Sequence, residues 1–584
     1  MTELAPAQIQ CRALLCAGLF SSALAFGAVT NTNPITLTID ASDPGYAVPS
    51  NFVGISVSSS SIDGDNNYTK FLTTNDTQVI NLFKQIGIKH MRTIVGPAES
   101  SDPDPSNAQI DAFFDFARAA GVNKIIWSLH LYNAESVTNW SNNRAVASHI
   151  WNTTTAAGTV ESNLLDSFAF DNEPDWLRVI CCTDPAITGY STPASTGGYI
   201  GVWRGWQQTI AALAPGAKFS GPDTGSKWPC PGEINTSVNG VPFTLQFATD
   251  AASVISGANQ HFYGQTGISN FTALQLAEAC LSSNWLTTNY TLINNDIVGS
   301  LPMPYRFTEC SAFDNETNAG NQIFATALWG LDFYHWWARH GCAGVNPFTR
   351  TAQYNAPIYY DGANYVAEAY AYGMKAFGLG SLGNVIYTSK FLINNPSNAN
   401  VTAYGVVNST DLYVTIINKT FSEVGSVTAN VTIPAPTGFS VQTARYMVLS
   451  GGPTPGLTGN ATITGACLGG AEIPNDGSAW AGAWTPLPVA AGGVSLAVQP
   501  TTAVIVDLQN IPVTLQWPQV NANGVFSFLV TGPSGYQYSI QNSTDLVNWT
   551  SLETVSNQTG SVDIVLNNGV PASGSYFYRA VLLQ

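Results

Sequence analysis

Residues 51–380 alternate between short apolar runs and segments with helical spacing, and this alternation restricts the possible folds more than any other feature. Runs such as Lys124–Leu129 have the length and composition of buried strands. Near Ala108–Ala120, apolar residues recur at the spacing of one helix face. The pattern predicts an α/β fold, a (β/α)8 TIM barrel over residues 51–380. The predicted strands are Phe52–Val57, His90–Val95, Lys124–Leu129, Leu165–Phe170, Lys218–Gly221, Asn259–Tyr263, Tyr305–Thr308 and Gly344–Phe348.

Two of the predicted strands lead directly to a glutamate. Asn172-Glu173-Pro174 follows the fourth strand, and Glu309 follows the seventh in Phe307-Thr308-Glu309-Cys310-Ser311. The strand ends form the catalytic face of a (β/α)8 barrel, so the two carboxylates are expected to meet there. Such a pair is typical of a retaining glycoside hydrolase, with Glu173 as acid/base and Glu309 as nucleophile. Two unrelated surface-loop carboxylates are the alternative, which explains the pairing less well.

Neighbouring polar residues predict how this site would hold a sugar. Asn172 is a candidate partner for the 2-hydroxyl group. Tyr263, at the end of the sixth strand, is a candidate donor to Glu309, although a core tyrosine bonded to a backbone carbonyl would give the same pattern. His261 is expected to support the site or the fold rather than to react. Asn346 and Arg350 are the available donors for a uronic acid carboxylate, although an arginine there also suits the surface.

After Phe377 the pattern changes to short strands of period two, separated by Gly, Pro and Asn. This predicts an antiparallel β-sandwich over residues 381–510. The segment 26–50 is expected to add a strand at Pro34–Ile39. The Ile511-Pro512 segment marks a predicted domain boundary, after which residues 511–584 are expected to form a further small all-β accessory module.

The N-terminus and the composition predict location and partners. Residues 1–25 resemble an export signal, with Arg12 before the apolar run from Leu14 to Phe26, which is too short to span a membrane. A secreted or periplasmic protein is expected. The net charge of −17 disfavours nucleic acid and anionic lipid as partners. The cysteine spacing does not fit a zinc site, so no metal or other cofactor is expected, and the oligomeric state is left open.

In this order the motifs resemble glycoside hydrolase family 79, the β-glucuronidases and heparanase-like enzymes, a family within a clan of retaining (β/α)8-barrel glycosidases. The similarity runs from about Pro34 to Leu508. It implies a secreted, exo-acting β-glucuronidase that releases a terminal β-linked uronic acid from a glycan by double displacement. The motifs are Asn51-Phe52-Val53-Gly54-Ile55-Ser56, Asn172-Glu173-Pro174-Asp175, His261-Phe262-Tyr263, Thr308-Glu309-Cys310-Ser311 and Gly344-Val345-Asn346.

Two departures from the family concern the sugar subsite. Ser58 stands where the family commonly has a carboxylate, and Pro347-Phe348 stands where relatives often have an aromatic residue and a histidine. A retaining β-glycosidase of the same clan that acts on a neutral sugar is therefore an alternative. A carbohydrate-binding surface protein without turnover is another, although it would have no need for both Glu173 and Glu309.

Overall fold

The computed structural model describes residues 29–30, 33–58, 60–63, 71–94, 105–131, 141–154, 160–170, 172–174, 190, 199–225, 237–238, 241–265, 271–313, 322–349, 356–421, 426–452, 460–510, 513–521, 523, 525–532, 536–566 and 576–583. The predicted export signal and Arg350 lie outside these ranges. In the described part, no helix is long and apolar enough to cross a membrane.

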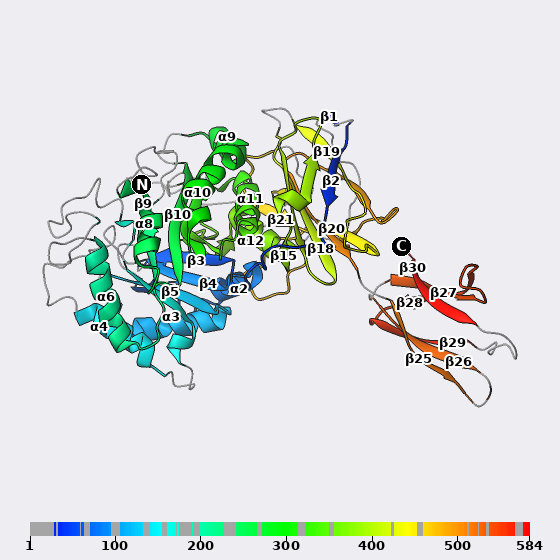
Figure 1. Cartoon of the computed structure of the whole chain (residues 1–584), viewed down its shortest axis with the longest axis horizontal. Coiled ribbons are helices and arrows are strands. Elements are labelled where there is room, and N and C mark those ends of the chain that lie inside the picture. The colour runs from blue at the N-terminus through cyan, green and yellow to red at the C-terminus, as the bar shows by residue number, and fades with distance from the viewer. Residues whose placement is uncertain are drawn as a thin grey trace, which may run out of the picture.

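A closed ring of eight parallel strands forms the N-terminal body, as the alternating pattern predicts (Figure 1). Each strand pairs with the next along the chain, and the last pairs with the first. The ring closes between the fourth and fifth strands through a bridge of Phe168 to Phe219 and a 2.9 Å hydrogen bond from Phe168 N to the Lys218 carbonyl. The strands are β3 (Gly54–Ser58), β4 (His90–Ile94), β5 (Lys124–Leu129), β6 (Leu165–Phe170), β7 (Ser220–Thr224), β10 (Gly257–Gln265), β11 (Tyr305–Phe313) and β12 (Val345–Thr349).

Helices cover the outside of this ring. Helix α3 begins after Ser106, whose side chain forms a capping box with Gln109, and it ends at Gly121 in the left-handed conformation. The helices are α1 (Ser60–Asp63), α2 (Thr77–Ile86), α3 (Asn107–Ala120), α4 (Ser141–Asn152), α6 (Tyr199–Leu213), α8 (Phe243–Asp250), α9 (Ala273–Leu281), α10 (Thr291–Asp296), α11 (Ala325–Arg339) and α12 (Ala369–Gly380), with short helical segments η2 (Glu161–Asn163), η4 (Trp285–Tyr290), η5 (Val298–Ser300) and η7 (Thr388–Lys390).

The sequence pattern did not predict α12. Nearly all of its side chains are buried, because it packs against α11 and also against strands of the sandwich, so it has no polar face to reveal a helical period. Its approach to α11 is close: a Cβ at Gly330 would meet the ring of Tyr370, and one at Gly373 would meet the Ala327 carbonyl oxygen at 2.3 Å.

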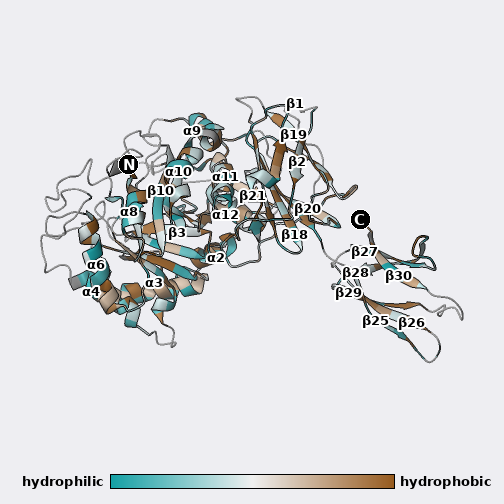
Figure 2. Ribbon diagram, viewed as in Figure 1, coloured by the Kyte–Doolittle hydropathy of each residue, from teal (hydrophilic) through white to brown (hydrophobic). Residues whose placement is uncertain are grey.

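The sandwich has two sheets, and the N-terminal strand β2 joins one of them between β16 and β19. Hydrophobic residues of both sheets form one core, which includes Leu37, Val414 and Val431. Figure 2 shows brown, hydrophobic segments along the barrel and sandwich strands. The first sheet contains β1 (Val29–Thr30), β2 (Ile35–Ile39), β16 (Phe391–Asn394), β19 (Val427–Ile433) and β23 (Val494–Val498); the second contains β15 (Asn384–Val385), β17 (Val401–Val407), β18 (Asp411–Asn418), β20 (Thr443–Gly451), β21 (Ala466–Leu468), β22 (Thr485–Pro486) and β24 (Thr502–Gln509).

A buried charge connects the sandwich to the barrel. Asp332 of α11 accepts hydrogen bonds from Tyr404 at 2.6 Å and Thr402 at 2.7 Å, and it forms an ion pair with Lys419 at 2.9 Å. All three partners belong to the sandwich or to the turn after β18. Because breaking a buried pair leaves a charge uncompensated, this network fixes how the two domains meet.

The C-terminal segment folds as two small sheets around a core of its own. Phe528, Val530, Tyr538, Ile540 and Ile564 form this core, separate from the core of the sandwich. The sheets are made of β25 (Thr514–Val520), β26 (Phe526–Thr531) and β29 (Ser561–Leu566), and of β27 (Tyr536–Ser543), β28 (Thr550–Asn557) and β30 (Phe577–Leu583). Two hairpins complete the strands: β8 (Ser237–Val238) with β9 (Val241–Pro242), and β13 (Ile358–Tyr360) with β14 (Tyr365–Ala367).

A chain that ends at Asn510 is expected to keep the barrel and the sandwich folded. Asn510 still donates its backbone N–H to the Thr410 carbonyl at 2.7 Å, and the module beyond it contributes nothing to the sandwich core. Thermal unfolding should show the same main transition in the full and the shortened chain. A control chain that ends at Gly380 should aggregate, because it exposes the apolar sides of α11 and α12. Unfolding of the chain that ends at Asn510 would show that the module belongs to the core.

Candidate active site

Glu309 lies within β11 and is almost fully buried in the barrel mouth. Arg92 Nη1 donates to its Oε2 at 3.1 Å, and the Tyr263 hydroxyl donates to its Oε1, the contact expected from the sequence. Burial raises the pKa of Glu309, while the positive charges of His261 and Arg92 and the Tyr263 hydrogen bond oppose this rise. All three neighbours favour the ionised carboxylate that a nucleophile requires.

Glu173 follows β6 in a backbone conformation that is rare for a residue with a side chain. Its φ of 53° lies in the left-handed region, which carries strain for a glutamate. Its N–H donates to the Asp223 carbonyl at 2.9 Å and thereby holds this turn. The side chain is 18% exposed, and its Oε1 lies 3.0 Å from His261 Nδ1. Glu173 thus faces the solvent side of the cluster, where a substrate would arrive.

The two glutamates face each other at close range. One carboxylate oxygen of Glu173, one of Glu309 and one ring nitrogen of His261 all lie within 4.8 Å of one another. Retaining glycosidases hold their two carboxyl groups about 5–5.5 Å apart, and inverting ones about 6.5–9.5 Å apart. The short distance between these two oxygens is compatible with the retaining separation.

His261 lies at the centre of three carboxylates. Its Nδ1 contacts Glu173 at 3.0 Å and Glu309 at 3.8 Å, and its Nε2 lies 3.7 Å from Asp223. Burial lowers the pKa of His261, but Glu309, Asp223 and Glu173 together outweigh this and raise it to about 9. The ring is therefore a cation at neutral pH. The sequence predicted a supporting position for His261, and the contacts place it directly between the groups that it supports.

The same three residues have donor atoms that could hold a metal ion. A cation there would have to displace the proton of His261 and lie close to the guanidinium of Arg92, which is 3.1 Å from Glu309. The charges already present thus favour proton transfer over metal binding at this place.

Sequence reasoning missed two residues of the cluster. Arg92 is fully buried on β4; besides Glu309 it contacts Asn172 Oδ1 at 2.9 Å and Asp223 at 3.5 Å. Asp223 is also fully buried and accepts from Thr308 Oγ1 and from Asn259 Nδ2, the latter at 3.1 Å. Burial raises the pKa of Asp223, but Arg92, His261 and Thr308 more than offset this and lower it to about 2. The available signal was Arg92 within the predicted strand His90–Val95, whereas Asp223 lies just after the predicted strand Lys218–Gly221.

Asn172 is positioned by Arg92. The guanidinium bonds the amide oxygen, which directs the amide nitrogen of Asn172 away from Arg92 and makes it the donor group at this point of the cleft. Ser58 is buried at the end of β3, with its hydroxyl 3.5 Å from that of Ser61. Both residues therefore lie at the carboxyl ends of barrel strands, where the sequence placed them.

Asn346, predicted from the sequence as a substrate contact, has other partners in the structure. Asn346 is fully buried inside the barrel, where its oxygen accepts from Arg306 at 3.0 Å. Its nitrogen contacts the Ile55 carbonyl at 3.0 Å and His90 Nδ1 at 2.9 Å. All of its hydrogen-bonding groups are therefore engaged below the cleft.

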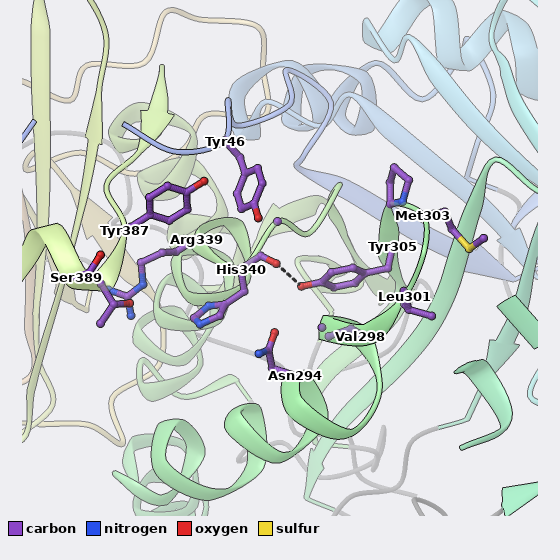
Figure 3. A pocket seen from close by; sticks show the side chains of 14 residues that line it. Tyr46, Asn294, Val298, Leu301, Met303, Tyr305, Arg339, His340, Tyr387 and Ser389 are labelled. Atoms are coloured by element: carbon purple, nitrogen blue, oxygen red, sulfur yellow. Dashed lines mark hydrogen bonds between the residues drawn. The ribbon is translucent and has the colours of Figure 1, made fainter. Parts of the chain in front are cut away.

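A cavity of about 630 Å³ lies elsewhere, where the barrel meets the sandwich (Figure 3). Tyr46, Tyr305, His340 and Tyr387 line it, and the Tyr305 hydroxyl donates to the His340 carbonyl at 3.1 Å. Pro304 and Tyr305 mark the start of β11, so this cavity is at the amino ends of the strands. Catalytic groups of (β/α)8 barrels lie toward the opposite, carboxyl ends. Glu173 follows the end of β6, and Glu309 lies within β11, beyond the residues that line this cavity.

This chain is similar in fold to solved structures of other proteins. No known family and no curated protein matches the sequence. A 4-O-α-L-rhamnosyl-β-D-glucuronidase from Fusarium oxysporum is 14% identical, with a TM-score of 0.57 over 81% of this chain and 100% of that one. A family 51 arabinofuranosidase from Xanthomonas axonopodis is 13% identical, with a TM-score of 0.56 over 82% and 100%. A bacterial orthologue of human α-L-iduronidase is 11% identical, with a TM-score of 0.51 over 94% and 97%.

The charge on His261 predicts a pH-dependent stability. Because its pKa rises to about 9 in the folded protein from an ordinary 6.5, its stabilising effect is complete below pH 6.5 and is lost as the pH rises through about 9. His261→Gln should therefore lower the free energy of unfolding by up to about 3 kcal/mol more at pH 6 than at pH 10. Urea unfolding across this range measures the difference.

His340→Gln is the matched control, because burial lowers the pKa of His340 to about 4 and the ring is neutral throughout this range. Its effect on stability should change by less than about 1 kcal/mol between pH 6 and pH 10, and in the opposite direction, because only the unfolded ring takes up a proton near pH 6.5. A change for His261→Gln that is as small, or that has the direction of this control, would contradict a cationic His261.

Proposed function

We propose that this protein is a retaining glycoside hydrolase. The observation that carries the proposal is the pair of glutamates after the fourth strand and within the seventh strand of the barrel, with carboxylate oxygens within 4.8 Å of each other. Glu309 attacks the anomeric carbon while Glu173 protonates the departing oxygen, and a glycosyl ester forms on Glu309. The shared fold with solved glycosidases supports the proposal.

The surrounding residues have distinct tasks in this reaction. Arg92 and the Tyr263 hydroxyl each hold one oxygen of Glu309 and thereby orient the nucleophile. His261 holds a proton next to Glu173 and can return a proton to Glu173 after Glu173 has donated its own. Once the ester has formed, Glu309 loses its charge, which makes it easier for Glu173 to stay ionised and take a proton from water. The amide nitrogen of Asn172 bonds the 2-hydroxyl, an interaction that strengthens in the transition state.

For the sugar, we propose a terminal β-linked uronic acid that an exo-acting, exported enzyme removes from a glycan. The sequence motifs support this, and one protein of the same fold is a glucuronidase. Arg92, the cation next to the catalytic pair, is already engaged by Glu309 and Asn172, so the uronate needs another donor. Arg350 remains a sequence prediction for that role. The buried Ser58, where family 79 commonly has a carboxylate, favours a neutral sugar as the second candidate.

Substitution of each glutamate tests the mechanism. Glu309→Ala should lose turnover of an aryl glycoside by several orders of magnitude and regain part of it with azide, which fits the vacated space. Glu173→Ala should be milder on substrates with a good leaving group, because these need less protonation. Steady-state rates measured for aryl glycosides whose leaving groups differ in pKa distinguish the two variants, because the rates should depend differently on that pKa.

Glu278→Ala, on the exposed side of α9, is the matched control and should keep full activity. Small and equal effects of Glu173→Ala and Glu309→Ala, in a protein that still binds sugar, would reject the hydrolase and leave a carbohydrate-binding protein.

A panel of aryl β-glycosides tests the sugar. The kcat/KM for the β-glucuronide should be about 100-fold or more above the values for the β-glucoside, β-galactoside and β-xyloside. A neutral sugar would leave the polar groups of a carboxylate-binding subsite without partners. Equal or better hydrolysis of a neutral glycoside would overturn the uronic acid assignment while leaving the mechanism intact.

A further inference from the structure

Three potential metal ligands meet on the outer side of the barrel, away from the catalytic cluster. Asp111 comes from α3, His149 from α4 and Glu161 from η2. One ligand atom of each lies within 4.8 Å of those of the other two. His149 Nε2 is 2.6 Å from Asp111 Oδ1. Three segments that are separate in the sequence thus direct two carboxylates and an imidazole to one point.

Glu161 is the informative member of this group. Its side chain is fully buried, and among the described residues no donor reaches either of its carboxylate oxygens. The nearby guanidinium of Arg118 is paired with Asp115 at 3.1 Å instead. Arg118 acts on Glu161 only through space, and an ionised buried carboxylate without a hydrogen bond is costly. Either a proton or a cation must therefore neutralise Glu161.

We propose that Asp111, His149 and Glu161 bind a divalent cation of the zinc class. One imidazole nitrogen with carboxylate oxygens is a donor set that Zn²⁺ accepts, whereas Ca²⁺ and Mg²⁺ prefer oxygen alone. Thr153 Oγ1 lies 3.1 Å from His149 Nδ1, where it can accept the ring proton and leave Nε2 free for the metal. The Asp111 side chain is 44% exposed, which provides an entry path and room for a water ligand.

A proton is the competing occupant. Burial and the neighbouring Asp111 carboxylate raise the pKa of Glu161 to about 8. Without a cation, Glu161 therefore holds a proton at neutral pH. A metal ion must displace that proton, because a carboxylate ligates only when ionised, and so binding should release protons into the buffer.

The proposed ion would connect two successive helices of the barrel with the segment that precedes the next strand. Segment η2 leads into β6, which ends just before Glu173. A cation held by α3, α4 and η2 would stabilise the start of that strand from outside the barrel. We therefore expect an effect on stability, with little change in turnover, and the proposal stands whether or not the protein is a hydrolase.

The test uses the full chain, stripped with a chelator and then titrated with Zn²⁺. Calorimetry in two buffers of different ionisation enthalpy measures affinity and proton release, and thermal unfolding measures the stabilisation. The variants are Glu161→Gln and His149→Gln, each of which removes one ligand at nearly constant size. Glu278→Gln is the control, because Glu278 is an exposed carboxylate on α9 outside the cluster. Glu309→Ala reports any zinc bound at the catalytic cluster.

Wild type, Glu278→Gln and Glu309→Ala should bind about one zinc ion per chain, release protons and unfold at a higher temperature as zinc rises. Glu161→Gln and His149→Gln should bind at least about 100-fold more weakly. If Glu161→Gln fails to fold, His149→Gln and proton release by the wild type decide the question. Equal affinity in the ligand variants, or no binding by the wild type at about 1 mM zinc, would overturn the proposal and leave a protonated Glu161.

Discussion

The barrel mouth depends on how four buried ionisable groups and the half-buried Glu173 balance one another. Glu173, Glu309 and Asp223 are carboxylates, and Arg92 and His261 supply the positive charges that make their burial tolerable. Arg92 reaches from β4 to groups that β7 and β11 carry and to Asn172 just after β6. Its contacts therefore require the register of all these strands to be correct at once. A slip in any one of them would leave a buried charge without its partner.

The same balance explains why the backbone tolerates strain at this place. Glu173 and Asp223 both have positive φ values, and the N–H of one donates to the carbonyl of the other. Strain of this kind persists only where the surrounding structure holds it, here through buried hydrogen bonds to Asp223. The strained turns direct Glu173 toward Glu309 and His261. The backbone strain is therefore accompanied by a favourable placement of the charged side chains.

The two clusters of acidic and histidine residues differ in how their charge is compensated. At the barrel mouth, Arg92 and a protonated His261 offset the carboxylates, and protons are the mobile species. Beside α3, no donor among the described residues reaches the Glu161 oxygens, and Arg118, which is paired with Asp115, acts on Glu161 only through space. The residue types are similar, but the nearby cation decides whether a cluster suits proton transfer or a bound ion.

The sequence by itself determined the elements and their order, because a buried strand and an amphipathic helix leave a local periodicity. It also placed Glu173 and Glu309 at the strand ends that meet in a barrel. Helix α12 was not predicted, because it is buried on nearly every side and has no period to detect. The tertiary structure alone decided the fate of isolated polar residues: Asn346 turned inward to Arg306, while Arg92 and Asp223 joined the cleft. Whether a polar side chain faces the barrel interior or the cleft depends on which charged side chains lie next to it across the barrel. Those neighbours come from strands that are far apart in the sequence.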